Sequence, residues 1–390
     1  MQKNNQKIPE GWSVKKLKEC FSFSAGGDVD KDCFSETQDD LHPYPIYANA
    51  LTNEGLYGYS SKYKVKEECI TITGRGDIGN VFYRKGYFTP IVRLITAIPN
   101  TGINAKFMSY ACSQIHFFDE STGVPQLTVP QVQWYKILLP PLPEQEKIAE
   151  ILGTWDETIE KLSGLIEQKK LLKKGLMQKL LTGKTHLPTF TQPWKEVAIQ
   201  DFCNIKRGGS PRPIENYLTS SDDGLNWLKI GDISPDAKYI YKTESKIKKD
   251  GVSKTTLVHS DDFILSNSMS FGRPYIMKID ACIHDGWLAL TSIKKDVSKE
   301  FLFYLLSFSE TQKKFNICAA GSGVRNLNKD IVGEVKIQLP PYYEQQAIAD
   351  VLSTADDEIN LLNQKLEALK EQKKGLMQQL LTGRIRVKVN

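Results

Sequence analysis

The most regular pattern in the chain is a stripe of apolar side chains spaced alternately four and three residues apart, between Glu144 and Leu181. This spacing is typical of a helix that pairs with another helix as a coiled coil. At about 1.5 Å per residue, such a helix would be about 57 Å long, so it requires a partner along its length. The stripe consists of Ile148, Leu152, Trp155, Ile159, Leu162 and Ile166.

The same segment occurs twice. Residues 137–183 recur without a gap 200 positions later as residues 337–383, and 25 of the 47 aligned positions are identical. The segments before the two repeats share little beyond isolated positions, such as Trp12 and Trp194. The chain therefore reads as two diverged segments, each followed by a nearly constant helix. The second stripe contains Ile348, Leu352, Ile359, Leu362, Leu366 and Leu369.

The ends of the repeated helix carry the expected signals. Pro140, Pro141 and Pro143 favour an extended approach, and acidic residues follow at the start of the helix. Gly183 and Gly383 provide the stops. If the two copies pair with each other, their order along the chain makes them antiparallel about a pseudo-twofold axis. We therefore expect two domains separated by a stiff helical rod.

The diverged segments predict small α+β domains. Residues 68–74, 80–88 and 90–98 alternate β-branched and aromatic side chains, whereas residues 104–114 and 298–315 show short amphipathic helical patterns. The expected fold is α+β: two globular domains and two long antiparallel coiled-coil helices with pseudo-twofold symmetry. The predicted segments are residues 1–139, 140–183, 184–339 and 340–390.

Composition narrows the class of protein. The 51 basic and 46 acidic residues give a net charge of +5 over 390 residues, which is compatible with nucleic acid without requiring it. There is no long apolar run and the first ten residues are polar, so we expect a cytoplasmic protein with neither a membrane span nor a secretory signal. Seven cysteines without a CxxC pair predict reduced, mostly buried thiols.

Basic and amide side chains near glycine turns are the candidates for contact with DNA. Arginine can bridge the edge of guanine, and asparagine or glutamine that of adenine. The alternative is ordinary use of aromatics in strands and of lysines on surfaces. The candidates are Arg75, Arg84 and Lys85 in the first segment, Arg207, Arg212 and Arg273 in the second, and the loop residues Gln126, Arg325 and Asn326.

The repeated motifs carry a resemblance to a known family. The sequences LPPLPEQEKIAEIL and LPPYYEQQAIADVL begin the two helices, KKGLMQKLLTG and KKGLMQQLLTG end them, and STGVPQL and GSGVRNL close the diverged segments. Together they resemble the specificity subunit of type I restriction-modification systems over essentially the whole chain. This resemblance implies that each diverged domain reads one half of a bipartite, asymmetric site in double-stranded DNA, and that the helices set the gap.

The resemblance also implies partners. A specificity subunit is not an enzyme itself; it guides two methyltransferase subunits that use S-adenosylmethionine. Restriction subunits that use ATP and magnesium can join the complex. The chain itself is then expected to hold no cofactor and no metal, and no membrane is involved. Lysines on the helices would be available to methyltransferase subunits or to phosphates, a solvated charged face being the alternative: Lys169, Lys170, Lys173, Lys174, Lys373 and Lys374.

Recurrent glycines and enzyme-like patterns have simpler explanations. Gly175 and Gly375 suggest close approach by a partner or a tolerated kink. The GxGxxG run at 74–79 is followed by strand-like residues, which predicts a hairpin turn. Residues 235–246 only loosely satisfy a PD…ExK nuclease pattern. Two alternatives to DNA reading stay open: a coiled-coil adaptor, and a self-sufficient nuclease or methyltransferase.

The loop residue Arg325 supplies the first test. If Arg325 reads a guanine, Arg325→Ala should cost about 1 to 3 kcal/mol of binding free energy and relax the preference at one base pair. Binding to a set of single-base variants of the DNA site measures this. Equal weakening on every sequence would instead indicate a phosphate contact.

Overall fold

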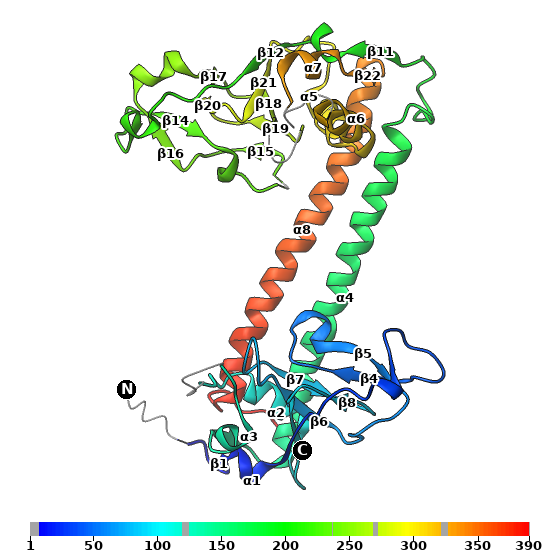
Figure 1. The fold of residues 1–390 in the computed structure, drawn as a ribbon, viewed down its shortest axis with the longest axis vertical. Coiled ribbons are helices and arrows are strands. Elements are labelled where there is room, and N and C mark those ends of the chain that lie inside the picture. Colours follow the sequence, from blue (N-terminus) through cyan, green and yellow to red (C-terminus); the bar gives the residue numbers. More distant parts are fainter. Residues whose placement is uncertain (1–7, 119–124, 236, 268–271, 321–326, 390) are drawn as a thin grey trace. The chain divides into compact units, whose positions relative to one another are not determined.

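The chain forms two compact units (Figure 1). The computed structural model describes residues 8–118, 125–235, 237–267, 272–320 and 327–389. The first unit contains residues 1–163 and 364–390, and the second contains residues 164–363. Each unit therefore combines one diverged segment with parts of both repeated helices. We call residues 8–139 the first domain and residues 191–339 the second domain.

The repeated segments are two uninterrupted long helices, α4 (Leu142–Leu180) and α8 (Tyr342–Leu381). Both end at glycines in the left-handed region, with φ of +69° at Gly183 and +67° at Gly383. This conformation strongly favours glycine. Both helices continue without a break through Gly175 and Gly375. A Cβ at either position would meet no atom within 4 Å, so packing inside the described chain does not require these glycines.

Within each unit the two helices run antiparallel. In the first unit, Asp156 pairs with Lys373, whereas Glu144, earlier in α4, pairs with the later residue Arg386. In the second unit, Lys169 pairs with Glu358 at 2.6 Å and Lys173 pairs with Asp356. Residue numbers rise along one helix as they fall along the other. The predicted antiparallel pairing is confirmed.

The apolar stripe has two kinds of neighbours. Leu162, Ile166, Ile359 and Leu366 are buried along the helices. The residues nearest the start of each helix are instead part of the core of a domain. Ile148 and Leu152 belong to the core of the first domain, and Ile348 and Leu352 to that of the second. Trp155, Ile159, Leu362 and Leu369 are half-buried.

Each domain core is completed by the far end of the other helix. Leu380 and Leu381, from the end of α8, lie in the core of the first domain, where they join strand and helix residues. Leu180 and Leu181, from the end of α4, lie in the core of the second domain. These four leucines are less than a tenth exposed. Each domain is therefore built from the start of its own helix and the end of the other copy.

The first domain contains an antiparallel four-stranded sheet, a mixed four-stranded sheet and a two-stranded pair that joins its two ends. The strand orders are β2-β9-β6-β7, β3-β5-β4-β8 and β1-β10. The pair β1-β10 is antiparallel, and Ser13 lies opposite Leu139. The elements are β1 (Ser13–Lys16), α1 (Leu17–Cys20), β2 (Phe21–Ala25), β3 (Phe34–Ser35), β4 (Tyr44–Tyr47), β5 (Leu56–Ser60), β6 (Cys69–Ile72), β7 (Val81–Arg84), β8 (Thr89–Pro90), β9 (Ile95–Pro99), α2 (Ala105–Cys112), α3 (Val129–Val132) and β10 (Lys136–Leu139).

The second domain also contains two larger sheets and one two-stranded pair, and each of its larger sheets has five strands. The orders are β12-β21-β18-β19-β15, β13-β16-β14-β20-β17 and β11-β22. The last pair is equivalent to β1-β10, because Lys195 lies opposite Leu339. The elements are β11 (Lys195–Ala198), β12 (Asn204–Arg207), β13 (Leu218–Thr219), β14 (Leu225–Leu228), β15 (Tyr239–Ile240), β16 (Ser245–Ile247), β17 (Thr256–Val258), β18 (Phe263–Ser266), β19 (Pro274–Met277), β20 (Ala281–Ile283), β21 (Trp287–Thr291), α5 (Lys299–Ser307), α6 (Ser309–Ala320), α7 (Lys329–Glu334) and β22 (Lys336–Leu339).

The predicted local elements agree with these strands and helices. The strand patterns at 68–74 and 80–88 contain β6 and β7, the pattern at 90–98 covers all of β9 except Pro99, and the helical pattern at 104–114 contains α2. The pattern at 298–315 is divided into α5 and α6, because Phe308 between them has an extended backbone. All seven cysteines are free, and only Cys318 is more than marginally exposed. Among the described residues, no helix has both the length and the apolar character that crossing a membrane requires.

A duplicated Glu-Gln pair fastens each domain to the start of its helix. The side chain of Gln145 donates to the carbonyl of Pro140 at 2.8 Å and accepts from the amide of Asn104 at 2.9 Å. Gln345 makes the equivalent bonds to Pro340 at 2.9 Å and to the amide of Ser298 at 2.8 Å. The side-chain amide of one glutamine thus joins the proline-rich approach to the residue that precedes α2 or α5.

The neighbouring glutamates differ between the copies. In the first unit, Trp12 Nε1 donates to Glu144 Oε2 at 3.2 Å, and Arg386 contacts both carboxylate oxygens. In the second unit, the equivalent Glu344 contacts His186 Nδ1 at 3.0 Å. Its Oε2 and Trp194 Nε1 are buried without a hydrogen-bond partner among the described residues. Glu144, which contacts the C-terminal tail, therefore has hydrogen-bond partners on both carboxylate oxygens, whereas Glu344 has one on Oε1 alone among the described residues.

Truncating a leucine at the start of α4 tests the shared core. Leu152 is fully buried, so Leu152→Ala should lower the free energy of unfolding by about 2 to 5 kcal/mol. Leu171, on the same helix, is 68% exposed, and Leu171→Ala should change it by less than about 0.5 kcal/mol. Urea unfolding of both variants gives the comparison. Equal effects would contradict the assignment of Leu152 to the core.

The tail junction predicts a pH dependence of stability. Hydrogen bonds from Arg386 hold the pKa of Glu144 below its ordinary value of 4.5, although burial opposes them. A lowered folded-state pKa stabilises the fold fully above the ordinary value, and this contribution is lost as pH falls through the lowered pKa. Arg386→Ala should therefore lower the melting temperature most above about pH 5, and the difference from wild type should shrink towards pH 3.

Arg384 provides the matched control, because it lies two residues away and is exposed. Arg384→Ala should leave the melting temperature nearly unchanged across the same pH series. A difference between Arg386→Ala and wild type that is constant with pH would show that Glu144 is not the linked group.

Candidate nucleic-acid interface

The loop between β6 and β7 is a tight hairpin. The amide of Thr73 donates to the carbonyl of Asn80 at 3.0 Å, and that of Gly79 donates to the carbonyl of Thr73 at 2.8 Å. Gly76 and Gly79 have φ of +67° and +83°. The run that resembles a dinucleotide-binding motif is therefore a turn between strands, as predicted from the residues that follow it.

This hairpin brings together two of the predicted contact residues. Arg75 lies opposite Gln126 in an isolated antiparallel bridge, and Arg75 Nη2 donates to Gln126 Oε1 at 3.3 Å. Asn49 fixes the turn from the side, since its Oδ1 accepts from the amide of Gly74 at 2.7 Å. Arg75 Nε is buried without a hydrogen-bond partner among the described residues. The guanidinium of Arg75 and the side-chain amide of Gln126 therefore lie together at this hairpin. An arginine can bridge the edge of guanine and a glutamine that of adenine, so both groups are able to read bases.

Arg84 points into the first domain. Its side chain is 3% exposed. Nε donates to Thr71 Oγ1 at 3.1 Å, Nη1 donates to Glu54 Oε2 at 3.1 Å, and the guanidinium lies 3.8 Å from the ring centre of Tyr47. Burial lowers the pKa of Arg84 from its ordinary value. Arg84 therefore stabilises the interior, in contrast to the surface role expected for it.

Lys85, the next residue, is on the surface. Its side chain is 72% exposed and pairs with Glu68 at 3.0 Å. A hydrogen bond from Lys85 lowers the pKa of Glu68. An exposed pair of this kind contributes little stability, so the lysine is available to exchange its partner for a phosphate.

In the second domain one carboxylate organises two exposed arginines. Ser210 Oγ donates to Asp285 Oδ1 at 2.6 Å, and Arg212 Nη2 lies 3.8 Å from Asp285 Oδ2. Arg207 Nε donates to the carbonyl of Asp285 at 3.4 Å. The hydrogen bond from Ser210 lowers the pKa of Asp285. Asp285 thus holds Arg207 and Arg212 near each other while leaving the Arg212 side chain 82% exposed.

The remaining predicted contacts fall elsewhere. Arg273 is half-buried and lines a cavity of about 400 Å³ together with Lys173 and Tyr304, beside the long helices. Arg325 and Asn326 lie outside the described residues, so their predicted role stays a prediction.

Three tyrosines form an additional surface of the first domain. The ring centres of Tyr44 and Tyr63 are 5.0 Å apart, those of Tyr63 and Tyr87 are 4.5 Å apart, and the rings meet edge to face. Tyr63 and Tyr87 are each about half exposed. Exposed aromatic edges next to Lys62 and Lys64 suit contact with a sugar-phosphate backbone.

The helix lysines are largely occupied within the chain. Lys169, Lys173 and Lys373 make ion pairs across the helix pair, and Lys170 pairs with Glu167 one turn earlier. Three of these ion pairs thus join the two helices, and contact of the helix lysines with methyltransferase subunits or phosphates stays a prediction.

The described residues hold no group of three or more histidine, cysteine, aspartate or glutamate side chains suited to a metal ion. Asp236 of the nuclease-like pattern lies outside the described residues.

Sequence reasoning did not identify the residues that organise these sites. Nothing in the sequence around Asp285 or Asn49 distinguishes them from ordinary loop residues. Asp156 and Asp356 carried a signal, since they are identical polar positions in the repeated helices. Asp156 accepts a hydrogen bond from Tyr110, and Asp356 accepts one from Tyr304. Both tyrosines lie in the diverged segments, where the two halves of the chain cannot be matched residue by residue.

Comparison with known proteins agrees with this architecture. The sequence matches the family described as "Type I restriction modification DNA specificity domain" twice, over residues 9–169 and 191–371. The chain belongs to this family. Both matches run from the start of a domain well into its helix, so one family unit is one diverged segment with its repeat.

Relatives of this family member are specificity subunits. The MjaVIII type I restriction enzyme specificity subunit of Methanocaldococcus jannaschii is 24% identical, and the match covers 98% of this chain and 95% of the relative. The MjaX specificity subunit of the same organism is 31% identical over 66% of this chain, a match that spans only 61% of MjaX.

Solved structures show the same fold. The S subunit of the type I restriction-modification system of M. genitalium matches with a TM-score of 0.64 at 17% identity, over 98% of both chains. A chain from a structural study of complex assembly in a type I R-M system matches with a TM-score of 0.63 at 18% identity, over 97% of this chain and all of the other.

Proposed function

We propose that this chain is the noncatalytic DNA-reading subunit of a type I restriction-modification complex and that its two domains read different half-sites. One observation carries the proposal: two unlike domains are attached by equivalent bonds to two helices of one repeated sequence. The equivalent bonds hold both domains on their helices in the same way. The two domains differ in sequence elsewhere, so their surfaces can contact different DNA sequences. Membership of the DNA specificity family supports the same function.

Within this proposal, the first domain reads through the Arg75–Gln126 hairpin and the second through the arginines held by Asp285. Lys85 and the tyrosine cluster contact the backbone of the DNA. Phosphate contacts set the register, and the guanidinium and amide groups supply preference for particular bases. Arg325 and Asn326 remain proposed contacts on the basis of sequence alone.

The proposed partners are double-stranded DNA and two methyltransferase subunits, with restriction subunits as further members of the complex. S-adenosylmethionine, ATP and magnesium would be bound by those subunits. Because the two units present equivalent parts of the repeated helices, a methyltransferase subunit can bind each of them in the same way.

The proposal predicts separable half-sites. In the complex with methyltransferase subunits, Arg75→Ala should reduce discrimination at one position of one half-site by about 1 to 3 kcal/mol, and Arg212→Ala should do so only in the other half-site. Methylation of a DNA library with both half-sites randomised measures the two effects. Each variant is the control for the other.

Two outcomes would contradict the proposal. Failure of the wild-type complex to prefer any bipartite sequence, together with binding that does not depend on salt, would favour an adaptor without a DNA role. Methyl transfer or cleavage by the purified chain alone would favour an enzyme.

A further inference from the structure

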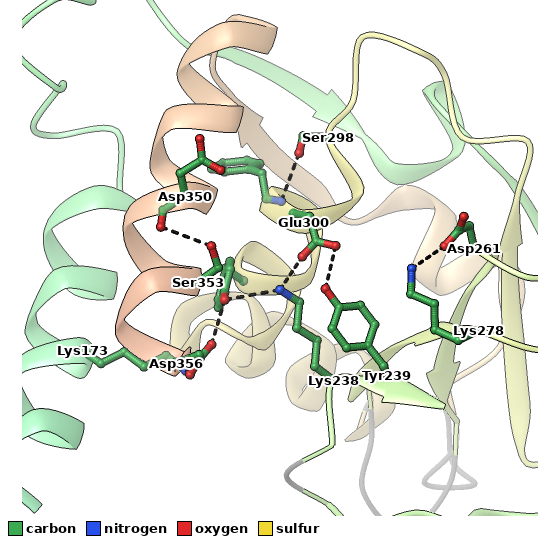
Figure 2. Close-up of polar contacts among 12 residues, drawn as sticks. Lys173, Lys238, Tyr239, Asp261, Lys278, Ser298, Glu300, Asp350, Ser353 and Asp356 are labelled. Atoms are coloured by element: carbon green, nitrogen blue, oxygen red, sulfur yellow. Dashed lines mark hydrogen bonds and ion pairs between the residues drawn. The ribbon is translucent and has the colours of Figure 1, made fainter. Parts of the chain in front are cut away.

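A three-residue contact occurs twice at the attachment of the domains. In the first unit it consists of Tyr110 on α2, Asp156 on α4 and Lys373 on α8. In the second unit it consists of Tyr304 on α5, Asp356 on α8 and Lys173 on α4. We call these contacts the attachment triads. Figure 2 shows Lys173 and Asp356 approaching each other from the two helices.

The geometry of the two triads is the same. Tyr110 Oη donates to Asp156 Oδ2 at 2.5 Å while Lys373 binds Oδ1 of that carboxylate. Tyr304 Oη donates to Asp356 Oδ2 at 2.7 Å while Lys173 binds Oδ1. Each lysine also lies over the ring of its tyrosine, 5.2 Å from the centre in the first unit and 5.6 Å in the second.

Each triad joins three segments of the chain at one carboxylate. The tyrosine belongs to a domain helix, the aspartate to the long helix that follows that domain, and the lysine to the long helix of the other copy. Burial, followed by the hydrogen bond to aspartate, raises the pKa of both tyrosines, so each phenol is a permanent donor. Tilting the domain breaks the tyrosine bond, and sliding the helices breaks the lysine bond.

The second triad is reinforced by a network that has no counterpart among the described residues of the first unit. Lys238 pairs with Glu300, and Tyr239 Oη donates to Glu300 Oε1 at 2.9 Å (Figure 2). Lys238 Nζ also reaches Tyr304 Oη at 3.4 Å. Lys238 also lies over the rings of Phe303 and Tyr304.

The first domain has the opposite charge at the position that corresponds to Glu300. Counting back four residues from the triad tyrosine leads to Glu300 in α5 and to Lys106 in α2. A Cβ at Gly153 would collide with Lys106 Nζ, whereas the equivalent position 353 is a serine. The glycine lets the lysine pass close to α4, so the two domains share the triad but not its surroundings.

We propose that the attachment triads are positioning residues that fix the angle of each reading domain on the helix pair and thereby restrict the length of the gap accepted between the two half-sites. The inference rests on the proposed function. None of the three side chains is assigned a contact with a base, so the triads act on the spacing and leave the base preferences to the loops.

The test uses the complete complex of this chain with methyltransferase subunits. Tyr110→Phe and Tyr304→Phe each remove one hydroxyl and preserve ring shape. The DNA substrates carry both preferred half-sites, separated by the preferred gap or by a gap one base pair longer or shorter. Loss of one hydrogen bond to a carboxylate should raise methylation on the wrong gaps, relative to the preferred gap, by roughly three- to tenfold.

Two controls make the result specific. Tyr241→Phe alters an exposed tyrosine in the same cavity as Tyr304 and should leave the gap profile unchanged. Lys173→Arg keeps the positive charge next to Asp356 and should keep a narrow profile, whereas Lys173→Met should broaden it.

The outcomes are distinct. A broadened gap profile with unchanged base preferences supports the triads as positioning residues. An unchanged gap profile in both tyrosine variants overturns the inference, as does an equal loss of base discrimination in the half-site of the altered domain. If the wild-type complex itself recognises no bipartite site, the proposed function fails instead. Thermal unfolding of each variant complex shows that the comparison is made between folded proteins.

Discussion

The structure depends on the exchange of helix ends between the two copies of the repeat. Leu380 and Leu381 fill the core of the first domain, and Leu180 and Leu181 fill that of the second. Removing either helix end would leave a cavity in the opposite domain, since these side chains are buried. Neither copy is therefore a self-sufficient folding unit, although each is a continuous stretch of sequence.

This exchange explains why the helices are nearly constant while the domains diverge. A helix residue such as Asp156 or Lys173 serves the domain next to it in sequence and the other helix at the same time. A substitution there has to satisfy two neighbours. A residue at a hairpin tip, such as Arg75, has few partners within its domain. It can therefore be replaced by another residue type with little effect on the fold.

The long helices could be predicted from sequence because a single period continues over their whole length. The apolar stripe and the terminal glycines place α4 and α8 within about two residues of their observed ends. The contact residues were harder to assign. The sequence shows an arginine at the end of β7 and a lysine directly after it, but only the fold shows that Arg84 is buried against Thr71 and Glu54 while Lys85 remains exposed. The partners of such a side chain come from other segments of the chain. Composition and periodicity do not show which of these segments lie close together in space.

The bonds at each junction also define what an incoming domain would need in order to be accepted. On the helix side the groups are repeated: a glutamate, a glutamine, an aspartate and a lysine. On the domain side they reduce to a tyrosine one helical turn and a half into a helix and the backbone amide that precedes this helix, to which the first unit adds the bond from Trp12. A foreign domain that supplies these few groups could be grafted onto the same helices, so new specificity can arise by recombination of whole domains without redesign of the scaffold.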